Sequence, residues 1–202
     1  MITGALEGIP SALGALRAGG VVAVATDTVY GLAADPRSTG AVQALFALKG
    51  RPSGLALPVL VADLSAGADL VAPGRKAAAL AALAERFWPG PLTVVVPARP
   101  DLGYALGGDG ASIGLRCPDL EALRALLAKS GPLAVTSANR HGEAPCTTAA
   151  QVAEVFADEV GIILDGGVCD GPPSTVVSLL GAEPALLRAG SIGLDALVAG
   201  LG

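Results

Sequence analysis

The sequence contains few of the side chains on which many enzymes build their active sites. Among its 202 residues there are one histidine, three cysteines and only 3% aromatic residues. A single histidine excludes zinc sites with several histidines and iron sites with two. A serine–histidine–aspartate triad would need His141, which lies in a loop containing glycine and proline, and we do not expect one there. Any chemistry is therefore expected to depend on positioning and charge.

Cysteine pairs, charge and long apolar runs are also scarce. Cys117, Cys146 and Cys169 are far apart and form no C-x-x-C pair, and the sequence begins without a signal-peptide pattern, which predicts a reduced, cytoplasmic protein. No apolar run approaches the ~20 residues of a membrane span, so no membrane association is expected. The net charge of −5 argues against strong non-specific binding to nucleic acid, but it leaves room for a local basic pocket.

Small apolar residues, by contrast, are abundant. Hydrophobic residues make up 52% of the chain, which is enough for a large core built from Ala, Val and Leu. No repeat or linker divides the sequence, so we expect one domain over residues 1–202. The 28 glycines and 15 prolines predict tight or irregular connections between its elements.

Strand and helix patterns follow one another along the chain. Runs rich in Val, Ile and Leu predict eight strands: Val21–Thr26, Leu57–Val61, Leu92–Pro97, Ser112–Cys117, Leu133–Ser137, Gly161–Asp165, Thr175–Leu180 and Ala185–Arg188. Helical patterns cover Ser11–Ala18, Thr39–Leu48, Arg75–Phe87, Leu120–Lys129 and Thr148–Phe156, with Asp119 as a predicted N-cap and Thr148–Gln151 as a predicted capping box. Because the alternation is imperfect, we expect a mixed, twisted α/β sheet with flanking helices.

Polar residues gather where the predicted strands end, which is where open α/β sheets bind ligands. In "VVAVATDTVYGL", an extended strand would place Thr26, Thr28 and Tyr30 on one face and Asp27 on the other. This hydroxyl row fits a pocket wall and an edge strand equally well, because threonine also favours β structure. Asp27 is expected to bind neighbouring backbone.

Four cations stand at the ends of predicted elements. Lys49 and Arg51 follow a helix that should stop at Gly50, and they fit either a phosphate chain or a solvated helix end. Arg116 ends an apolar strand in "SIGLRCPD", so it needs an internal carboxylate or a ligand anion as its partner. Arg188 ends the strand in "LLRAGSIG". Together they favour a small polyanionic ligand in a concave site.

Two further loops carry hydrogen-bonding side chains. Thr136, Ser137 and Asn139 follow a buried strand, where they suit either a ligand or a self-capped turn. The segment "ILDGGVCDGPPSTVV" forms a rigid loop before Ser174, but it lacks the spacing of a P-loop and of G-x-G-x-x-G. Neither standard phosphate cradle is therefore predicted.

The stretches "TDTVYGL", "KGRP", "FWPGPLT", "SIGLRCP", "TSANRHG", "LDGG" with "STVV", and "LLRAGSIG" occur in an order that resembles the YrdC/TsaC family, the L-threonylcarbamoyladenylate synthases. The resemblance spans roughly residues 17–193 and fits the short, single-domain form of the family. It implies a YrdC-like fold, in which a mixed sheet surrounds a deep, positively lined cavity.

The same resemblance implies a reaction. L-Threonine, bicarbonate and ATP would give threonylcarbamoyl-AMP and pyrophosphate, with Mg²⁺ carried by the triphosphate and no dedicated protein ligands for the metal. Other proteins would then transfer the threonylcarbamoyl group to a tRNA adenosine beside the anticodon, and a weak tRNA contact by this chain is compatible with that role. No protein nucleophile is needed, which agrees with the residues that the chain lacks.

The resemblance also implies site residues. The catalytic and ATP set is Lys49, Arg51, Ser137 and Asn139, and further ATP contacts are Ser112, Thr147 and Arg188. The L-threonine set is Thr28, Tyr30, Arg116, Ser137 and Ser174.

The chain departs from the family pattern at three places. Residues 55–57 are apolar, Pro145 stands where a hydroxyl is usual, and Pro173 stands where an acidic residue is common. These changes bear on affinity more than on reaction type. Two alternatives stay open: an RNA- or nucleotide-binding module without synthase activity, and a carbamoyl-transfer module of the hydrogenase-maturation type. The acidic charge disfavours the first, and the lack of attached zinc-binding and acylphosphatase segments disfavours the second.

Overall fold

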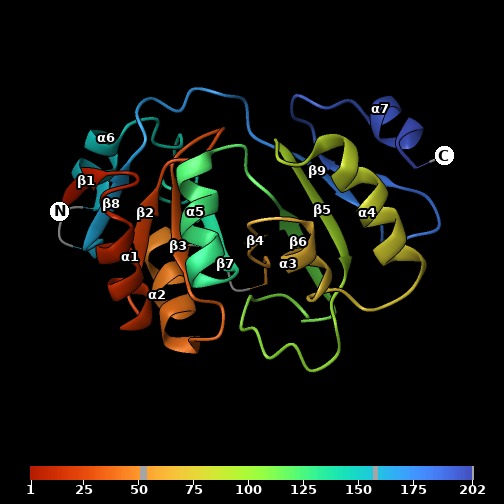
Figure 1. The fold of residues 1–202 in the computed structure, drawn as a ribbon, viewed down its shortest axis with the longest axis horizontal. Helices are drawn as coiled ribbons and strands as arrows, with labels where there is room; N and C mark the ends of the chain where they lie inside the picture. Colours follow the sequence, from red (N-terminus) through yellow and green to blue (C-terminus); the bar gives the residue numbers. More distant parts are fainter. Residues whose placement is uncertain (51–53, 157–158, 202) are drawn as a thin grey trace.

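A computed structural model describes residues 1–50, 54–156 and 159–201, and its strands form one ten-stranded sheet (Figure 1). The spatial order is β1-β8-β2-β3-β7-β4-β6-β5-β9-β10. The strands are β1 (Ile2–Gly4), β2 (Val22–Val24), β3 (Gly31–Ala34), β4 (Val59–Leu60), β5 (Leu92–Pro97), β6 (Ser112–Arg116), β7 (Leu133–Ser137), β8 (Ile162–Asp165), β9 (Thr175–Ser178) and β10 (Ala185–Arg188). Parallel and antiparallel pairs both occur, so the predicted mixed α/β sheet is confirmed.

Helices lie on both faces of this sheet. They are α1 (Ile9–Arg17), α2 (Thr39–Lys49), α3 (Leu64–Ala68), α4 (Arg75–Phe87), α5 (Glu121–Ser130), α6 (Ala149–Phe156) and α7 (Leu194–Ala199). In Figure 1, α1, α2, α5 and α6 gather around the half of the sheet that contains the N-terminus, and α3, α4 and α7 lie at the other half. No described helix has both the length and the apolar character needed to cross a bilayer.

Two cores result from this arrangement. Leucines of α1 and α5 pack on one face of the sheet, against Val22, Val24 and Leu133. Side chains of α2, α4 and α6 pack on the other face, where Ala23 and Leu32 lie. Because β2 is covered on both sides, all of its residues are apolar and buried.

The face of the sheet that α1 and α5 cover is not covered by any described helix over β5 and β6. On β5 and β6, Val94, Ile113 and Leu115 point into the large core, whereas the alternate side chains Thr93 and Ser112 point to the opposite face. That face is hollowed into a cavity. The same alternation places Ser112, Gly114 and Arg116 together, as the sequence predicts.

Several sequence-based boundaries change. The strand predicted over Val21–Thr26 ends at Val24, and β1, β3, α3 and α7 have no counterpart among the predicted elements. The predicted cap at Asp119 is wrong: Leu120 occupies the N-cap without a side-chain bond, and Asp119 pairs with Arg124 instead.

The predicted capping box before α6 is present in a shifted form. The hydroxyl of Thr148 accepts from the N–H of Gln151 at 3.2 Å. The Gln151 side chain reaches back to the N–H of Thr147 at 2.7 Å, one residue earlier than in the usual box. The predicted stop of α2 at Gly50 is confirmed, because this glycine has the left-handed φ of 61°.

Candidate active site

A cavity of about 420 Å³ lies over β5, β6, β7 and β9 and is closed on one side by the turn that follows β2. Its wall contains many hydroxyl groups: Thr26, Thr28, Tyr30, Thr93, Ser112, Thr136, Ser137 and Ser174. Two arginines, Arg116 and Arg188, also line it. The remaining wall is apolar, and it includes Ala56, Leu57, Pro145 and Pro173 at the departures noted in the sequence.

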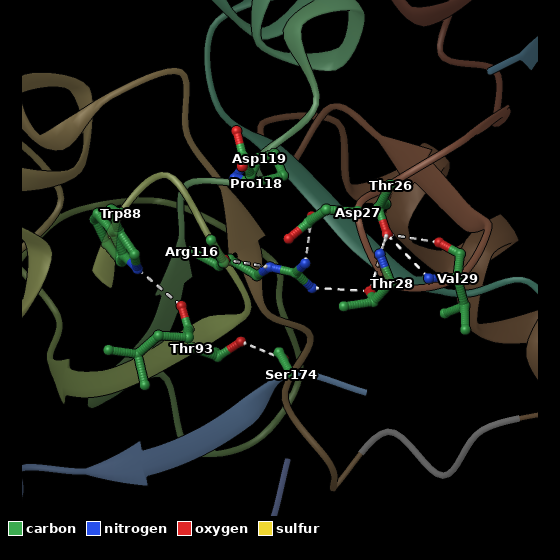
Figure 2. Close-up of polar contacts among 12 residues, drawn as sticks. Thr26, Asp27, Thr28, Val29, Trp88, Thr93, Arg116, Pro118, Asp119 and Ser174 are labelled. Atoms are coloured by element: carbon green, nitrogen blue, oxygen red, sulfur yellow. Dashed lines mark hydrogen bonds and ion pairs between the residues drawn. The ribbon is translucent and has the colours of Figure 1, made fainter. Parts of the chain in front are cut away.

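The threonines after β2 form a turn instead of an extended row. The Thr26 hydroxyl accepts from the N–H groups of Thr28 at 3.0 Å and Val29 at 3.2 Å, and it donates to the Val29 carbonyl at 2.6 Å (Figure 2). A threonine side chain can bind the backbone two or three residues ahead in this way. The hydroxyl of Thr28 lies 2.9 Å from that of Thr26. The predicted strand alternation is therefore wrong here, although Thr26 and Thr28 both face the cavity.

Arg116 is the centre of this end of the cavity. Its guanidinium donates to the Thr28 hydroxyl at 3.2 Å and to the Asp27 carboxylate at 2.5 Å (Figure 2). It also donates to the Gly90 carbonyl at 3.1 Å. Only 8% of the Arg116 side chain and 12% of the Asp27 side chain are exposed. Burial lowers the pKa of Arg116, and the negative charge of Asp27 opposes that shift.

Asp27 therefore has a different role from the one predicted for it. It binds the Arg116 side chain, because a bend after β2 turns its carboxylate toward β6. Of the two partners that the sequence allows for Arg116, an internal carboxylate and a ligand anion, the internal carboxylate is present. The guanidinium nevertheless keeps further N–H groups beyond the three that these bonds use.

The motif "FWPGPLT" supplies the Gly90 carbonyl. Trp88 precedes a cis proline bond, and its indole N–H donates to the Leu92 carbonyl at 2.8 Å. Gly90 sits so close to the preceding helix that an added Cβ would lie 2.5 Å from the Phe87 carbonyl. This motif is one of those that carry the family resemblance, and the sequence alone assigns it no role. Its tight turn places an acceptor beside Arg116.

Ser174 joins the second arginine to the sheet. Its hydroxyl lies 2.9 Å from that of Thr93 and accepts from the Arg188 guanidinium at 2.8 Å. Arg188 also donates to the Ser174 carbonyl at 3.0 Å. Burial lowers the pKa of Arg188. No carboxylate of the described residues lies within ion-pair distance of it, so the cavity carries uncompensated positive charge there.

Lys49, Ser137 and Asn139 come together beside the cavity, as predicted. The buried Lys49 ammonium donates to the carbonyl and hydroxyl of Ser137, both at 2.9 Å, and to the side-chain oxygen of Asn139. The Ser137 hydroxyl lies 2.7 Å from that same oxygen. Of the three, Ser137 lines the cavity. Arg51 lies outside the described residues.

Two predicted residues use their hydroxyls elsewhere. Tyr30 forms part of the cavity wall, but its hydroxyl donates toward the Gly167 carbonyl at 2.9 Å and the Asp165 carboxylate at 3.1 Å. Burial raises the pKa of Tyr30 to about 12. The hydroxyl of Thr147 binds Gln151 at 3.1 Å, and Thr147 is not part of the cavity wall.

Thr93 is a cavity residue that the sequence did not single out. It is the polar residue of the strand "LTVVVP". A threonine that alternates with core residues along a strand indicates a position on the opposite face of the sheet, so the sequence could have identified it. Thr136, which the sequence noted only as a strand-end hydroxyl, lies in the same wall.

The fold and the cavity define a class: an α/β protein whose mixed sheet holds a small-ligand site with buried hydroxyls, two arginines and an adjacent Lys–Ser–Asn cluster. The sequence profile of the Sua5/YciO/YrdC family, described as "Telomere recombination", matches residues 14–190. The chain belongs to this family, which confirms the resemblance found in its motifs.

Individual relatives extend the match over nearly the whole chain. The threonylcarbamoyl-AMP synthase of Bacillus subtilis is 39% identical over 197 residues, which are 96% of this chain and 56% of that protein. A Mycobacterium tuberculosis relative is 38% identical, over 97% of this chain and 90% of its own length. The crystal structure of P. abyssi Sua5 complexed with L-threonine superposes with a TM-score of 0.91 at 34% identity, covering 100% of this chain and 61% of that one.

Proposed function

We propose that this protein is an L-threonylcarbamoyladenylate synthase, which converts L-threonine, bicarbonate and ATP into threonylcarbamoyl-AMP, pyrophosphate and water. The observation that carries the proposal is the cavity: buried hydroxyls and two arginines lie beside a Lys–Ser–Asn cluster, in a chain similar to a Sua5 structure that holds L-threonine. Curated relatives named threonylcarbamoyl-AMP synthase support the same activity.

The chemistry needs two steps and no protein nucleophile. The threonine amine attacks the carbon of bicarbonate, and loss of water gives a carbamate. A carbamate oxygen then attacks the α-phosphorus of ATP, and the bond to the β,γ-pyrophosphate breaks. The protein must hold two anions together and offset the charge that develops on the leaving group, which is work for fixed cations and hydroxyls.

The Arg116 end of the cavity is proposed to bind L-threonine. The Arg116 guanidinium suits the amino-acid carboxylate, since its Asp27 bond leaves N–H groups for a second anion. Thr28 and Ser174 are proposed to bind the polar groups of threonine, and Tyr30 contributes wall surface. Ser137 belongs to the Lys–Ser–Asn cluster and also lines the cavity, so it is proposed to contact threonine as well.

ATP is proposed to bind along the part of the cavity wall that contains Ser112, Ser137 and Arg188. Lys49, Arg51 and Asn139 would contact the phosphates, while Ser112 and Arg188 would contact the nucleotide. Arg188 binds Ser174 through two hydrogen bonds, so the proposed threonine and nucleotide regions meet at this pair. A carbamate built on threonine would then lie next to the α-phosphate. A contact between Thr147 and ATP would require its hydroxyl to give up the hydrogen bond to Gln151.

Mg²⁺ is proposed to enter with ATP. Across the described residues no group of three or more His, Cys, Asp or Glu side chains could hold a metal ion. Hydroxyls and one amide at the proposed phosphate site do fit an ion whose ligands come mainly from phosphate oxygens and water. The metal would neutralise part of the triphosphate charge.

The test is an omission experiment with the purified protein. Pyrophosphate release is expected only when ATP, Mg²⁺, L-threonine and bicarbonate are all present, and mass spectrometry should identify threonylcarbamoyl-AMP. Absence of that product under complete conditions would refute the proposal. Retention of full activity by Lys49→Ala or Arg51→Ala would refute the residue roles.

The product would serve cytoplasmic proteins that transfer the threonylcarbamoyl group to a tRNA adenosine beside the anticodon. The alternative, an RNA- or nucleotide-binding module without synthase activity, predicts salt-dependent RNA affinity and no turnover. The net charge of −5 disfavours it.

A further inference from the structure

The C-terminal turn of α2 receives hydrogen bonds from the loop that follows β7. Gly50 closes the helix, and its N–H donates to carbonyls of the preceding turn. The two carbonyls nearest the end accept from outside the helix: that of Leu48 from the Arg140 guanidinium at 2.7 Å, and that of Lys49 from the His141 N–H at 2.8 Å. Because the last carbonyls of an α-helix have no partners within it, these two bonds complete the cap.

The Arg140 side chain is held from its other side by α6. It donates to the Val155 carbonyl at 3.3 Å, forms an ion pair with Glu159, and lies 4.8 Å from the centre of the Phe156 ring. The ion pair itself is half-exposed and contributes little. The carbonyls and the ring fix the guanidinium in place, so Arg140 bridges the C-terminal ends of α2 and α6.

The backbone at the same position orients Asn139. The Asn139 amide nitrogen donates to the Arg140 carbonyl at 2.8 Å and to the Glu143 carbonyl at 2.7 Å. With both of its N–H groups used in this way, the Asn139 oxygen turns toward Lys49 and lies 2.7 Å from the Ser137 hydroxyl.

We propose that Arg140 is a positioning residue that fixes Lys49 relative to Asn139. Its bond to the Leu48 carbonyl joins the residue just before Lys49 to the residue just after Asn139. Arg140 does not line the cavity, so it acts through those two neighbours. This inference rests on the proposed function, since it assigns a role in the alignment of the phosphate-binding cluster.

The first test replaces the side chain. Arg140→Ala should lower kcat about tenfold while the KM for L-threonine changes less than twofold, because loss of alignment affects the reacting phosphate more than threonine binding. Arg140→Lys should recover part of the loss, since lysine restores one donor without the fork. Arg86→Ala is the matched control: Arg86 also binds a helix carbonyl, that of Ala199, and lies 6.0 Å from the Phe87 ring. Its helix, α4, lies at the other half of the sheet from α2, which carries Lys49 (Figure 1).

A double-mutant cycle separates alignment from stability. In an Asn139→Ala background, Arg140→Ala should cost less than threefold in kcat, because its effect passes through the side chain already removed. Equal costs in both backgrounds, or an unchanged kcat in Arg140→Ala, would overturn the inference. If the Arg140→Ala variant does not fold, Arg140→Lys replaces it in the same double-mutant cycle. An inactive parent protein would instead refute the proposed function.

Discussion

At the scale of single residues, the Thr28 hydroxyl lies between the turn after β2 and Arg116 at the proposed threonine end of the cavity. It contacts the Thr26 hydroxyl at 2.9 Å and accepts from Arg116 at 3.2 Å. A ligand at this end of the cavity would therefore meet a hydroxyl whose orientation is fixed by a buried cation.

Thr28→Val keeps the shape of this side chain and removes its hydrogen bonds. A bond to a charged group contributes about 1.5–3 kcal/mol, so the KM for L-threonine should rise at least tenfold. The KM for ATP should change less than twofold. Initial rates measured with each substrate varied in turn distinguish the two effects. Equal increases in both KM values would contradict the assignment of Thr28 to the threonine end.

Asp27→Asn tests the buried ion pair. Removing one partner leaves the Arg116 charge buried without compensation, so the free energy of unfolding should fall by about 3 kcal/mol. Asp119→Asn is the control: 65% of its side chain is exposed in its pair with Arg124, so its loss should cost less than about 1 kcal/mol. Urea denaturation of both variants measures the difference, and similar small losses would show that the Asp27 pair is not important for stability.

Residue types and motif order predict more of the site than local spacing does. Residue chemistry alone does not join Lys49 of "KGRP" to Ser137 and Asn139 of "TSANRHG". The resemblance in motif order groups them, and the structure places the three side chains within hydrogen-bond distance of one another. The partner of Arg116 could not be identified in this way. Asp27 reaches Arg116 only because the chain bends after Val24. The Thr26 hydroxyl stabilises that bend, but the sequence alone is equally compatible with a strand that continues through Thr26.

At the scale of elements, Gly190 shows how closely two segments must approach. A Cβ on this glycine would lie 2.4 Å from both the Pro173 carbonyl and the Thr175 nitrogen. These are backbone atoms of the segment that carries Ser174, so they cannot move aside without shifting the cavity wall.

Gly190→Ala should therefore destabilise the fold by about 1–3 kcal/mol and lower activity as well. Gly193→Ala is a matched control in the same loop, because a Cβ there would meet no atom within 4 Å. Thermal unfolding and synthase assays on the two variants give the comparison. A Gly190→Ala protein with parental stability would show that the backbone contact is looser than described.

The eight strands and five helices predicted from apolar runs are all present, with small shifts at their ends. The missed strands have physical reasons. In β3, three of the four residues of "GLAA" are glycine or alanine, which carry little strand preference. The strand lies between β2 and β7 and is buried along its whole length. In β1, three residues depend on pairing with a distant strand. Neither signal is local.

At the scale of the whole molecule, alkaline pH should destabilise the fold. Burial raises the pKa of the Cys117 thiol from 9.0 to about 11, and burial also raises the pKa of Tyr30 to about 12. A raised pKa means that the folded state holds the proton more tightly. The stabilisation is complete below pH 9 and is lost as the pH rises through the folded-state values.

Cys117→Ser should reduce that loss between pH 9 and 11. The thiol donates to the Ala62 carbonyl at 3.2 Å, and a serine hydroxyl can also donate there without titrating in this range. The midpoint of thermal unfolding, measured at several pH values, gives the slope for each protein. Identical slopes would show that ionisation of Cys117 does not contribute.

The sheet order also has a consequence for how the molecule is made. Strand β1 pairs in parallel with β8, which sets Ile2 beside Ile163, and β5 pairs with β9, which sets Leu92 beside Thr175. During synthesis, β1 cannot pair with β8 until the ribosome has added some 160 further residues. Pairings between such distant segments slow folding. The cavity wall includes residues of both β5 and β9, so the cavity is complete only after these two strands have paired. Because substrate would bind only to the complete cavity, it would stabilise those newly made molecules in which the last strands have joined the sheet.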